Sequence, residues 1–154
     1  SDDLKKNLTI KPFVYDELSL IISKSHPFAR KKTINKEDLY CLDFITLNPN
    51  STIKKFIDNI LIQNQIETKQ LKTILQLNSI EGIKTAVSLG LGAAFVSSSA
   101  IEKEIQLKTI GIIKIEKIKI NRKLSIISNP QCYKSKAFDF FYTELIRLKN
   151  KIEN

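Results

Sequence analysis

Hydrophobic residues recur with a helical period in three stretches of this chain. In the first, apolar residues follow the i, i+3, i+4, i+7 pattern over 53–61, directly after Ser51 and Thr52, either of which can cap a helix. In the second, a capping residue at Ser79 precedes apolar residues that share one face up to Val87. The third has heptad-like spacing and a wide apolar face, formed by Phe138, Phe141, Leu145, Leu148 and Ile152. The pattern predicts three helices, the last of which is expected to cover a sheet.

Short apolar runs between turn signals predict strands. These runs are 18–22, 44–47, 73–76, 93–96 and 124–127. The run at 93–96 is apolar throughout, which is typical of a strand buried on both faces. Between 110 and 120 the alternation shifts by one residue, and a turn near Glu116 and Lys117 explains the shift. Short helical turns are expected at 36–40 and 101–104.

The stretch from Asn78 to Ser97 contains a helix, two glycines and a strand in that order. Gly90 occupies the position after the helix that favours a left-handed backbone, and the strand follows at once. A helix that leads so directly into a buried strand is one crossover of a parallel α/β sheet. A dinucleotide-binding loop has the strand before its glycines and a third glycine. We therefore interpret Gly90 and Gly92 as backbone devices and not as a phosphate loop.

Composition is that of a globular chain. It has 154 residues, of which 42% are hydrophobic, and no apolar run approaches the roughly 18 residues that span a bilayer. The net charge of +9 raises the possibility of a nucleic-acid surface, but the lysines are spread along the whole length. We favour solvated lysines over a DNA groove, since Lys, Ile and Asn all have A/T-rich codons. The chain starts at Ser1 and contains no methionine, so we expect a fragment.

Residues suited to catalysis are scarce. The only histidine, His26, precedes a proline and is expected to shape or cap a turn. Cys41 and Cys132 lack metal-ligand spacing and are expected to be buried free thiols, so we predict no metal site. The adjacent Asp16 and Glu17 are interpreted as solvated. No catalytic residue is assigned, and we predict that the chain is not an enzyme.

The best candidate for binding is the segment Asn48-Pro-Asn-Ser-Thr52. It follows a strand and opens a helix, which places hydroxyls and free backbone N–H groups at a positive helix terminus. Such a terminus can hold an anion or a carboxylate. Ordinary N-capping explains the same residues equally well, and the residues alone leave both interpretations open.

Two segments resemble the effector-binding domain of LysR-type transcriptional regulators. One is DELSLIISKSHPF at 16–28, and the other is NSIEGIKTAVSLGLGAAFVS at 78–97. The order of motifs, from the His-Pro loop through the capped helix and the Gly-Leu-Gly crossover to the terminal helix, matches along nearly the whole chain. The second segment is most similar to the branch that regulates RuBisCO operons in autotrophic bacteria, cyanobacteria and algal plastids.

The resemblance implies an α/β fold of the type 2 periplasmic-binding-protein kind, with two Rossmann-like lobes and mostly parallel sheets. On this basis 1–45 would be the remainder of lobe one and the crossover, 46–120 lobe two, and 121–154 the return to lobe one with the C-terminal helix. The N-terminal winged helix-turn-helix and the first strands of lobe one are missing from the pattern. Lobe one is therefore expected to be incomplete, and the fragment should not bind an operator alone.

The implied function is the effector-binding region of a DNA-binding regulator, a probable RuBisCO operon activator that senses a small anionic metabolite. Candidate effectors are a sugar phosphate, an organic acid or NADPH, and no cofactor is expected. Asn50, Ser51 and Thr52 would face the cleft at the lobe-two helix start, which favours ligand binding there, and Ser97 and Ser98 would be hinge or cleft residues. DNA contact would need the missing helix-turn-helix, the intact protein would be a dimer or tetramer, and no membrane is involved. A plastid-encoded protein would work in the chloroplast stroma, and otherwise in the bacterial cytoplasm.

Three alternatives remain open. A solute-binding protein of the same fold would deliver its ligand to a transporter, although the chain shows no signal peptide pattern and its cysteines are expected to be unpaired. An enzyme using a cleft carboxylate such as Glu81 has no supporting constellation. Direct DNA binding through lysines would require a salt-dependent affinity.

Overall fold

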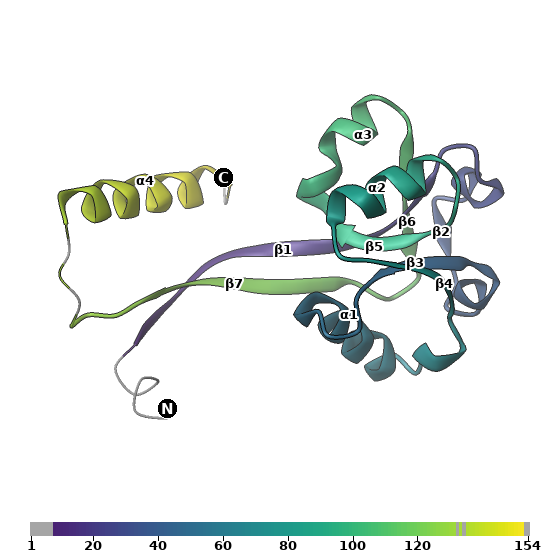
Figure 1. Cartoon of the computed structure of the whole chain (residues 1–154), viewed down its shortest axis with the longest axis horizontal. Coiled ribbons are helices and arrows are strands. Elements are labelled where there is room, and N and C mark those ends of the chain that lie inside the picture. Colours follow the sequence, from purple (N-terminus) through teal and green to yellow (C-terminus); the bar gives the residue numbers. More distant parts are fainter. Residues whose placement is uncertain (1–7, 132, 134, 153–154) are drawn as a thin grey trace. The chain divides into compact units, whose positions relative to one another are not determined.

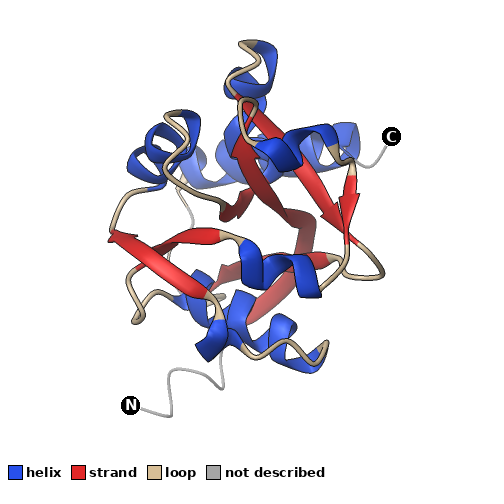
Figure 2. Cartoon of the chain, turned by 90° about the vertical axis from the view of Figure 1, so that its right-hand side faces the viewer, coloured by secondary structure: helices blue, strands red, loops and turns tan. Residues whose placement is uncertain are grey.

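The computed structural model describes residues 8–131, 133 and 135–152, with side chains described up to Lys149. The chain divides into two compact units, and Figures 1 and 2 show its elements. The larger unit is 17–120, and the smaller one combines 1–16 with 121–154. Residues 17–45 therefore pack with 46–120, whereas the resemblance had grouped 1–45 together. The division into lobes inferred from that resemblance stays a prediction.

The larger unit is built on a mixed sheet. Strand β1 (Thr9–Ser23) enters it and pairs antiparallel with β5 (Ala94–Ser97) and β6 (Ile110–Ile115). Strand β2 (Thr33–Ile34) runs parallel to β6, and β3 (Asp43–Leu47) runs parallel to β4 (Lys72–Leu77). A parallel bridge at Ala93, together with its hydrogen bonds to Asp43 and Ile45, connects β3 to the start of β5.

Helices cover both faces of this sheet, and each face has its own apolar core. Helix α1 (Thr52–Gln63) buries Ile57 and Leu61 on one face, where β1 contributes Leu18 and Leu20. Helices α2 (Ile80–Ser88) and α3 (Glu102–Gln106) lie at the other core, which contains Ile83, Val87 and Ile101. Short 3₁₀ helices connect the elements: η2 (Pro27–Arg30), η3 (Glu37–Cys41), η4 (Thr68–Gln70) and η5 (Ser98–Ile101). The α/β class is as predicted.

Most of the local predictions for this unit are confirmed. The predicted strands at 18–22, 44–47 and 73–76 lie in β1, β3 and β4, and the first two predicted helices are α1 and α2. Gly90 has φ +81° after α2, and Lys117 has φ +61° in the turn where the alternation shifts. The prediction of a strand buried on both faces at 93–96 is confirmed for Ala93, Ala94 and Val96, which belong to the cores on the two faces, while Phe95 is only half-buried. Only one face of β5 is fully covered, by α2.

The smaller unit holds the first part of β1, strand β7 (Ile120–Ser128) from Asn121 on, and helix α4 (Lys136–Ile152). Asp16 is not solvated as predicted: its side chain is 10% exposed and accepts a hydrogen bond of 2.6 Å from Arg122 Nε. The third predicted helix is present as α4, but Phe138, Phe141 and Leu148 on its apolar face are exposed. The two strands described in this unit are too few to bury such a face. Side-chain placement at Ile152 lies outside the described residues.

The prediction for His26 is confirmed, and the prediction that Cys41 is buried is wrong. His26 caps η2 as predicted, since its Nδ1 accepts a hydrogen bond of 3.1 Å from Phe28 N–H. Partial burial lowers the pKa of His26, which favours the neutral acceptor form. Cys41 is a free thiol, but it is exposed and not buried, because η3 turns Leu39 into the core instead. Cys132 lies outside the described residues. None of the described helices has the length and apolarity needed to cross a bilayer.

Candidate functional site

Three parallel strands end at one edge of the larger unit's sheet. Strands β4, β3 and β5 lie in that spatial order, and their carboxyl ends are Leu77, Leu47 and Ser97. Ligands of open α/β sheets bind outside the carboxyl ends of parallel strands. The five residues predicted as effector contacts lie at these ends: Asn50 and Ser51 precede α1, Thr52 begins it, Ser97 ends β5 and Ser98 begins η5. The fold therefore brings Asn50–Thr52 and Ser97–Ser98 to the same edge of the sheet.

The loop after β3 is shaped by Asn48. The Oδ1 atom of Asn48 accepts a hydrogen bond of 2.9 Å from Asn50 N–H, and its carbonyl accepts one of 2.8 Å from Ser51 N–H. Asn48 N–H donates to the Leu77 carbonyl at 3.2 Å, which attaches the loop to the end of β4. An asparagine that bonds its own backbone two residues on fixes a turn. The start of α1 is thereby held in place without using the side chains of Asn50, Ser51 or Thr52.

Those three side chains are available at the start of α1. Asn50 and Thr52 are exposed, Ser51 is half-buried, and Ser51 occupies the N-cap position without a side-chain capping bond. The first hydrogen bond of the helix runs from Lys55 N–H to the Ser51 carbonyl, so the N–H groups before it have no intrahelical acceptor. The first turn contains no acidic residue. The terminus therefore keeps its positive partial charge and its donors, the combination that binds anions.

Ser97 and Ser98, at the end of β5, make different hydrogen bonds. The Ser98 hydroxyl donates to the Glu17 carbonyl at 3.1 Å and lies 2.7 Å from the Ser19 hydroxyl. Ser98 therefore connects the start of η5 to β1. The Ser97 hydroxyl is half-buried and lies 2.8 Å from the Ser99 hydroxyl. The structure places Ser98 in a supporting role by its hydrogen bonds, while effector contact by either serine stays a prediction.

The N-terminus of α2 differs from that of α1 because side chains at the start of α2 already bond a backbone N–H group and bring a negative charge. The Ser79 hydroxyl accepts a hydrogen bond of 3.4 Å from Gly82 N–H, and Glu81 lies in the first turn. Glu81 also pairs with Lys84, at 2.9 Å between Oε1 and Nζ. A carboxylate at this terminus already neutralises the helix dipole. Of the two α-helices that follow the parallel strands, α1 is the one with a free terminus.

Lys84 is the centre of a charged cluster that the sequence did not reveal. It is 8% exposed, and its ammonium donates to the Ala100 carbonyl at 2.9 Å and pairs with Glu104 at 3.1 Å. The hydrogen bond with Glu81, helped by Glu104, raises the pKa of Lys84 against the effect of burial. Burial opposes ionisation of Glu104, but a backbone hydrogen bond and Lys84 outweigh it and lower the pKa of Glu104. The i, i+3 spacing of Glu81 and Lys84 was a readable signal, whereas Glu104 comes from a distant segment.

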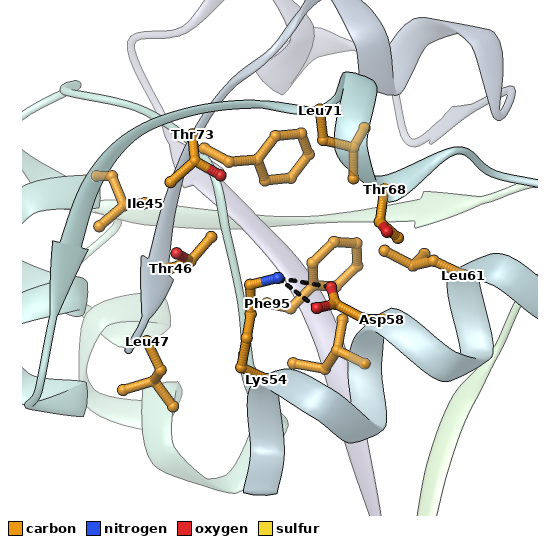
Figure 3. Close-up of a pocket in the computed structure, with 12 residues that line it drawn as sticks. Ile45, Thr46, Leu47, Lys54, Asp58, Leu61, Thr68, Leu71, Thr73 and Phe95 are labelled. Carbon is orange, nitrogen blue, oxygen red and sulfur yellow. Dashed lines mark hydrogen bonds and ion pairs between the residues drawn. The ribbon is translucent and has the colours of Figure 1, made fainter. Parts of the chain in front are cut away.

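A small cavity lies beneath α1, between the helix and strands β3 and β4 (Figure 3). Lys54 Nζ extends across it and pairs with both Asp58 oxygens, at 2.6 and 2.5 Å. The Phe44 and Phe95 rings, which stack 6.0 Å apart, are among the apolar lining. Its volume of about 40 Å³ is enough for a few water molecules and too small for a metabolite. The exposed start of α1 is therefore the better candidate site.

Comparison with known proteins decides the family. A family model described as "LysR substrate binding domain" matches residues 2–148. The chain belongs to the LysR substrate-binding domain family. The resemblance seen in the sequence is confirmed.

Relatives and solved structures agree with the family. The chain is 76% identical over 152 residues to a "Probable RuBisCO transcriptional regulator" of Phaeodactylum tricornutum, covering 99% of this chain and 50% of the relative. A Synechocystis protein of the same name is 51% identical over 144 residues, covering 94% and 42%. The chain thus spans about half the length of the curated relatives it matches.

Two solved structures share the fold of this LysR substrate-binding domain. The regulatory domain of Synechocystis CcmR in complex with 2-PG has a TM-score of 0.80 at 23% identity, covering 93% of this chain and 67% of that one. The effector binding domain of QuiR in complex with shikimate has a TM-score of 0.76 at 18% identity, covering 96% and 68%. The predicted periplasmic-binding-protein-like fold is confirmed by this family and these neighbours.

Proposed function

We propose that this chain is the effector-sensing region of a transcriptional regulator of RuBisCO operons, and that a small anionic metabolite binds at the start of α1. Relatives at 50–76% identity carry the RuBisCO regulator name, which supports a regulator over a solute-binding transport protein. The observation that carries the site is the free α1 terminus, where Ser51 caps nothing and no acidic residue competes. Backbone N–H groups and the Ser51 and Thr52 hydroxyls would hold the anion.

The ligands named for the two neighbours support this chemistry. Shikimate and 2-PG appear in the names of the QuiR and CcmR structures, and both are small carboxylates. We infer the same class for this chain, with sugar phosphates, organic acids and NADPH as further candidates. Binding would favour one of two arrangements of the regulator, so the effector would act as a population shift and not as a substrate.

The remaining properties concern the longer regulator. We propose that operator contact belongs to the part of the relatives that this chain does not match, and that the intact protein is a dimer or tetramer. Relatives from Phaeodactylum tricornutum and Synechocystis support a plastid or cyanobacterial setting. We therefore propose the plastid stroma as the place of action.

Calorimetric titration of the complete regulator with 2-PG, sugar phosphates, organic acids and NADPH tests the site. Ser51→Ala and Thr52→Ala should each weaken the best binder by about tenfold, because each removes a hydroxyl that bonds a charged ligand. Ser51→Ala should leave stability nearly unchanged, since this hydroxyl makes no capping bond. Ser79→Ala is the matched control: it should cost about 1 kcal/mol of stability and leave affinity unchanged. The site is wrong if no anion binds, or if both α1 variants bind as tightly as the parent.

A further inference from the structure

The order of the parallel strands reverses at β3. The chain passes from β3 through α1 to β4 on one side, and then returns through α2 to β5 on the other side of β3. Helix α1 packs at one apolar core, whereas η5, which follows β5, contributes Ile101 to the other core. In open α/β sheets, ligands bind where the strand order reverses in this way. The turn that leaves β5 therefore lies at the same reversal point as the start of α1.

Ser98 attaches this turn to β1. The pairing of β1 with β5 ends at Leu18 and Ser97. The next hydroxyl, that of Ser98, donates to the Glu17 carbonyl at 3.1 Å. That bond uses the single hydroxyl proton of Ser98, so Ser19 is the donor in the 2.7 Å contact between the Ser19 and Ser98 hydroxyls. The first residue of η5 is thus fixed to a strand of the sheet by two side-chain hydrogen bonds.

Lys84 holds the same turn from the side of α2. Its ammonium donates to the Ala100 carbonyl at 2.9 Å, and its contacts with Glu81 and Glu104 are at 2.9 and 3.1 Å. An ammonium has three protons, so these three partners use all of them. Lys84 is buried, and its position fixes that of the Ala100 carbonyl. The turn is therefore anchored at two alternate residues, Ser98 and Ala100.

The residue between the two anchors is Ser99. It is exposed, whereas Ser98 and Ala100 are half-buried. The Ser99 hydroxyl lies 2.8 Å from that of Ser97. A serine hydroxyl both donates and accepts, and its proton rotates to suit its partner. Ser99 can therefore direct its proton to an anion, while the residues on either side of it keep the turn in place.

We propose that Ser99 contacts the effector from the turn after β5, and that Ser98 is the positioning residue that holds Ser99 there. This inference rests on the proposed function, because the effector concerned is the anion held at the start of α1. Ser98 acts through Ser99 and not by contact, since its hydroxyl is engaged with Glu17 and Ser19. Without that hydroxyl the turn loses its attachment to β1 but keeps the one to Lys84, so Ser99 is displaced while the fold remains.

Calorimetric titration of the complete regulator with 2-PG tests this role. Ser99→Ala should weaken 2-PG binding about tenfold, because it removes a hydrogen bond to a charged ligand, and should leave the melting temperature unchanged. Ser98→Ala should weaken 2-PG binding to a similar extent. In the Ser99→Ala background, Ser98→Ala should have no further effect on affinity, because a positioning residue acts only through the residue it positions. A general loosening of the fold would instead add its loss to that of Ser99→Ala.

Two serines of β1 provide the controls. Ser19→Ala removes the hydrogen-bond partner of Ser98 and should weaken 2-PG binding in the same direction. Ser23→Ala is the matched control, since Ser23 is equally buried at the other end of β1, where its hydroxyl lies 2.8 Å from that of Ser25. It should lower the melting temperature about as much as Ser19→Ala does and leave 2-PG affinity unchanged.

The positioning role is overturned if Ser98→Ala or Ser99→Ala binds 2-PG as the parent does, if their losses add in the double variant, or if Ser23→Ala loses as much affinity as Ser19→Ala. Should any of these occur while Thr52→Ala weakens 2-PG binding, the α1 site stands without the turn. Equal binding by Thr52→Ala and the parent would refute the α1 site, and the positioning role would fail with it. Absence of 2-PG binding would overturn the positioning role as well, and the other anions would then test the α1 site alone.

Discussion

Replacing Gly92 by alanine should destabilise the chain more than any exchange of a surface residue. Gly92 precedes the bridge that connects β3 to β5, and a Cβ added to it would lie 2.6 Å from the Asp43 carbonyl oxygen. It would also lie 3.2 Å from Ile45 Cγ1. The first contact is with backbone, which cannot rotate away as a side-chain end can. The two segments must therefore separate.

The loss in the free energy of unfolding can be estimated from the hydrogen bonds that connect β3 to the start of β5. Ala93 N–H donates to the Asp43 carbonyl and Ile45 N–H donates to the Ala93 carbonyl, both at 2.8 Å. Moving the Asp43 oxygen about half an ångström away stretches the first bond beyond the usual range. One or two weakened bonds cost about 0.5–1.5 kcal/mol each, and overpacking costs about 1–3 kcal/mol. The expected loss is about 2–5 kcal/mol of the free energy of unfolding, a large part of a typical domain's 5–15 kcal/mol.

Urea unfolding followed by circular dichroism measures this loss, with the m-value checked for two-state behaviour. Gly82→Ala is the matched control, because its Cβ would meet nothing closer than Leu77 Cδ1 at 3.5 Å inside α2. That exchange should stabilise the chain by about 0.5–1 kcal/mol, since alanine suits a helix better than glycine. A Gly92→Ala loss below about 1 kcal/mol, or an equal loss in the control, would refute the close approach as the reason for this glycine.

Three further predictions follow from buried polar groups. Lys84→Met should cost about 3 kcal/mol at neutral pH, because it leaves Glu104 buried and unpaired. The fold lowers the pKa of Glu104, so the ionised carboxylate stabilises the parent above the ordinary pKa of 4.5, and this stabilisation is lost as pH falls. Acid unfolding curves of parent and variant should therefore converge. Thr46→Val should raise the melting temperature by the equivalent of about 1 kcal/mol, since the Thr46 hydroxyl is buried without a hydrogen-bond partner in the described structure, and a loss would show that the hydroxyl is satisfied. Arg122→Met should lower the free energy of unfolding in urea by about 1–3 kcal/mol, because Asp16 would lose its partner at 2.6 Å. If the two side chains are coupled, the double variant Asp16→Asn with Arg122→Met should recover part of this loss.

The sequence predicted those elements whose signals are local. The apolar spacing after Ser51 and the turn at Lys117 correspond to α1 and to the end of β6, because each depends on a few neighbouring residues. The first part of β1 was missed, since Thr9–Glu17 carries a proline and charges and stays largely exposed. Its strand conformation comes from pairing with β7, which is distant in sequence. Tertiary pairing of this kind leaves no local pattern.

The position in the fold of the segment proposed as the effector site was predictable, and its hydrogen bonding only partly. The order strand, Asn48 turn and capped helix placed Asn50–Thr52 at the carboxyl edge of the sheet before the structure did. Whether the Ser51 hydroxyl caps the helix could not be read from the residue type, and only the geometry shows that it does not. The hydrogen bonds of Ser98 to Glu17 and Ser19 likewise join segments far apart in sequence. Burial of Lys84 depends on such a long-range partner as well.

The unengaged side chains of Asn50, Ser51 and Thr52 have a consequence for how such domains diverge. The backbone of this loop is fixed by Asn48 and by the end of β4, so the three side chains can be exchanged without disturbing the core. Most mutations are limited by the stability they cost, and these positions carry almost none of it. At the effector site proposed for the α1 terminus, ligand preference can therefore drift while the sheet beneath it is held constant. Related regulators could in this way acquire different metabolic signals through a few substitutions on one unchanged scaffold.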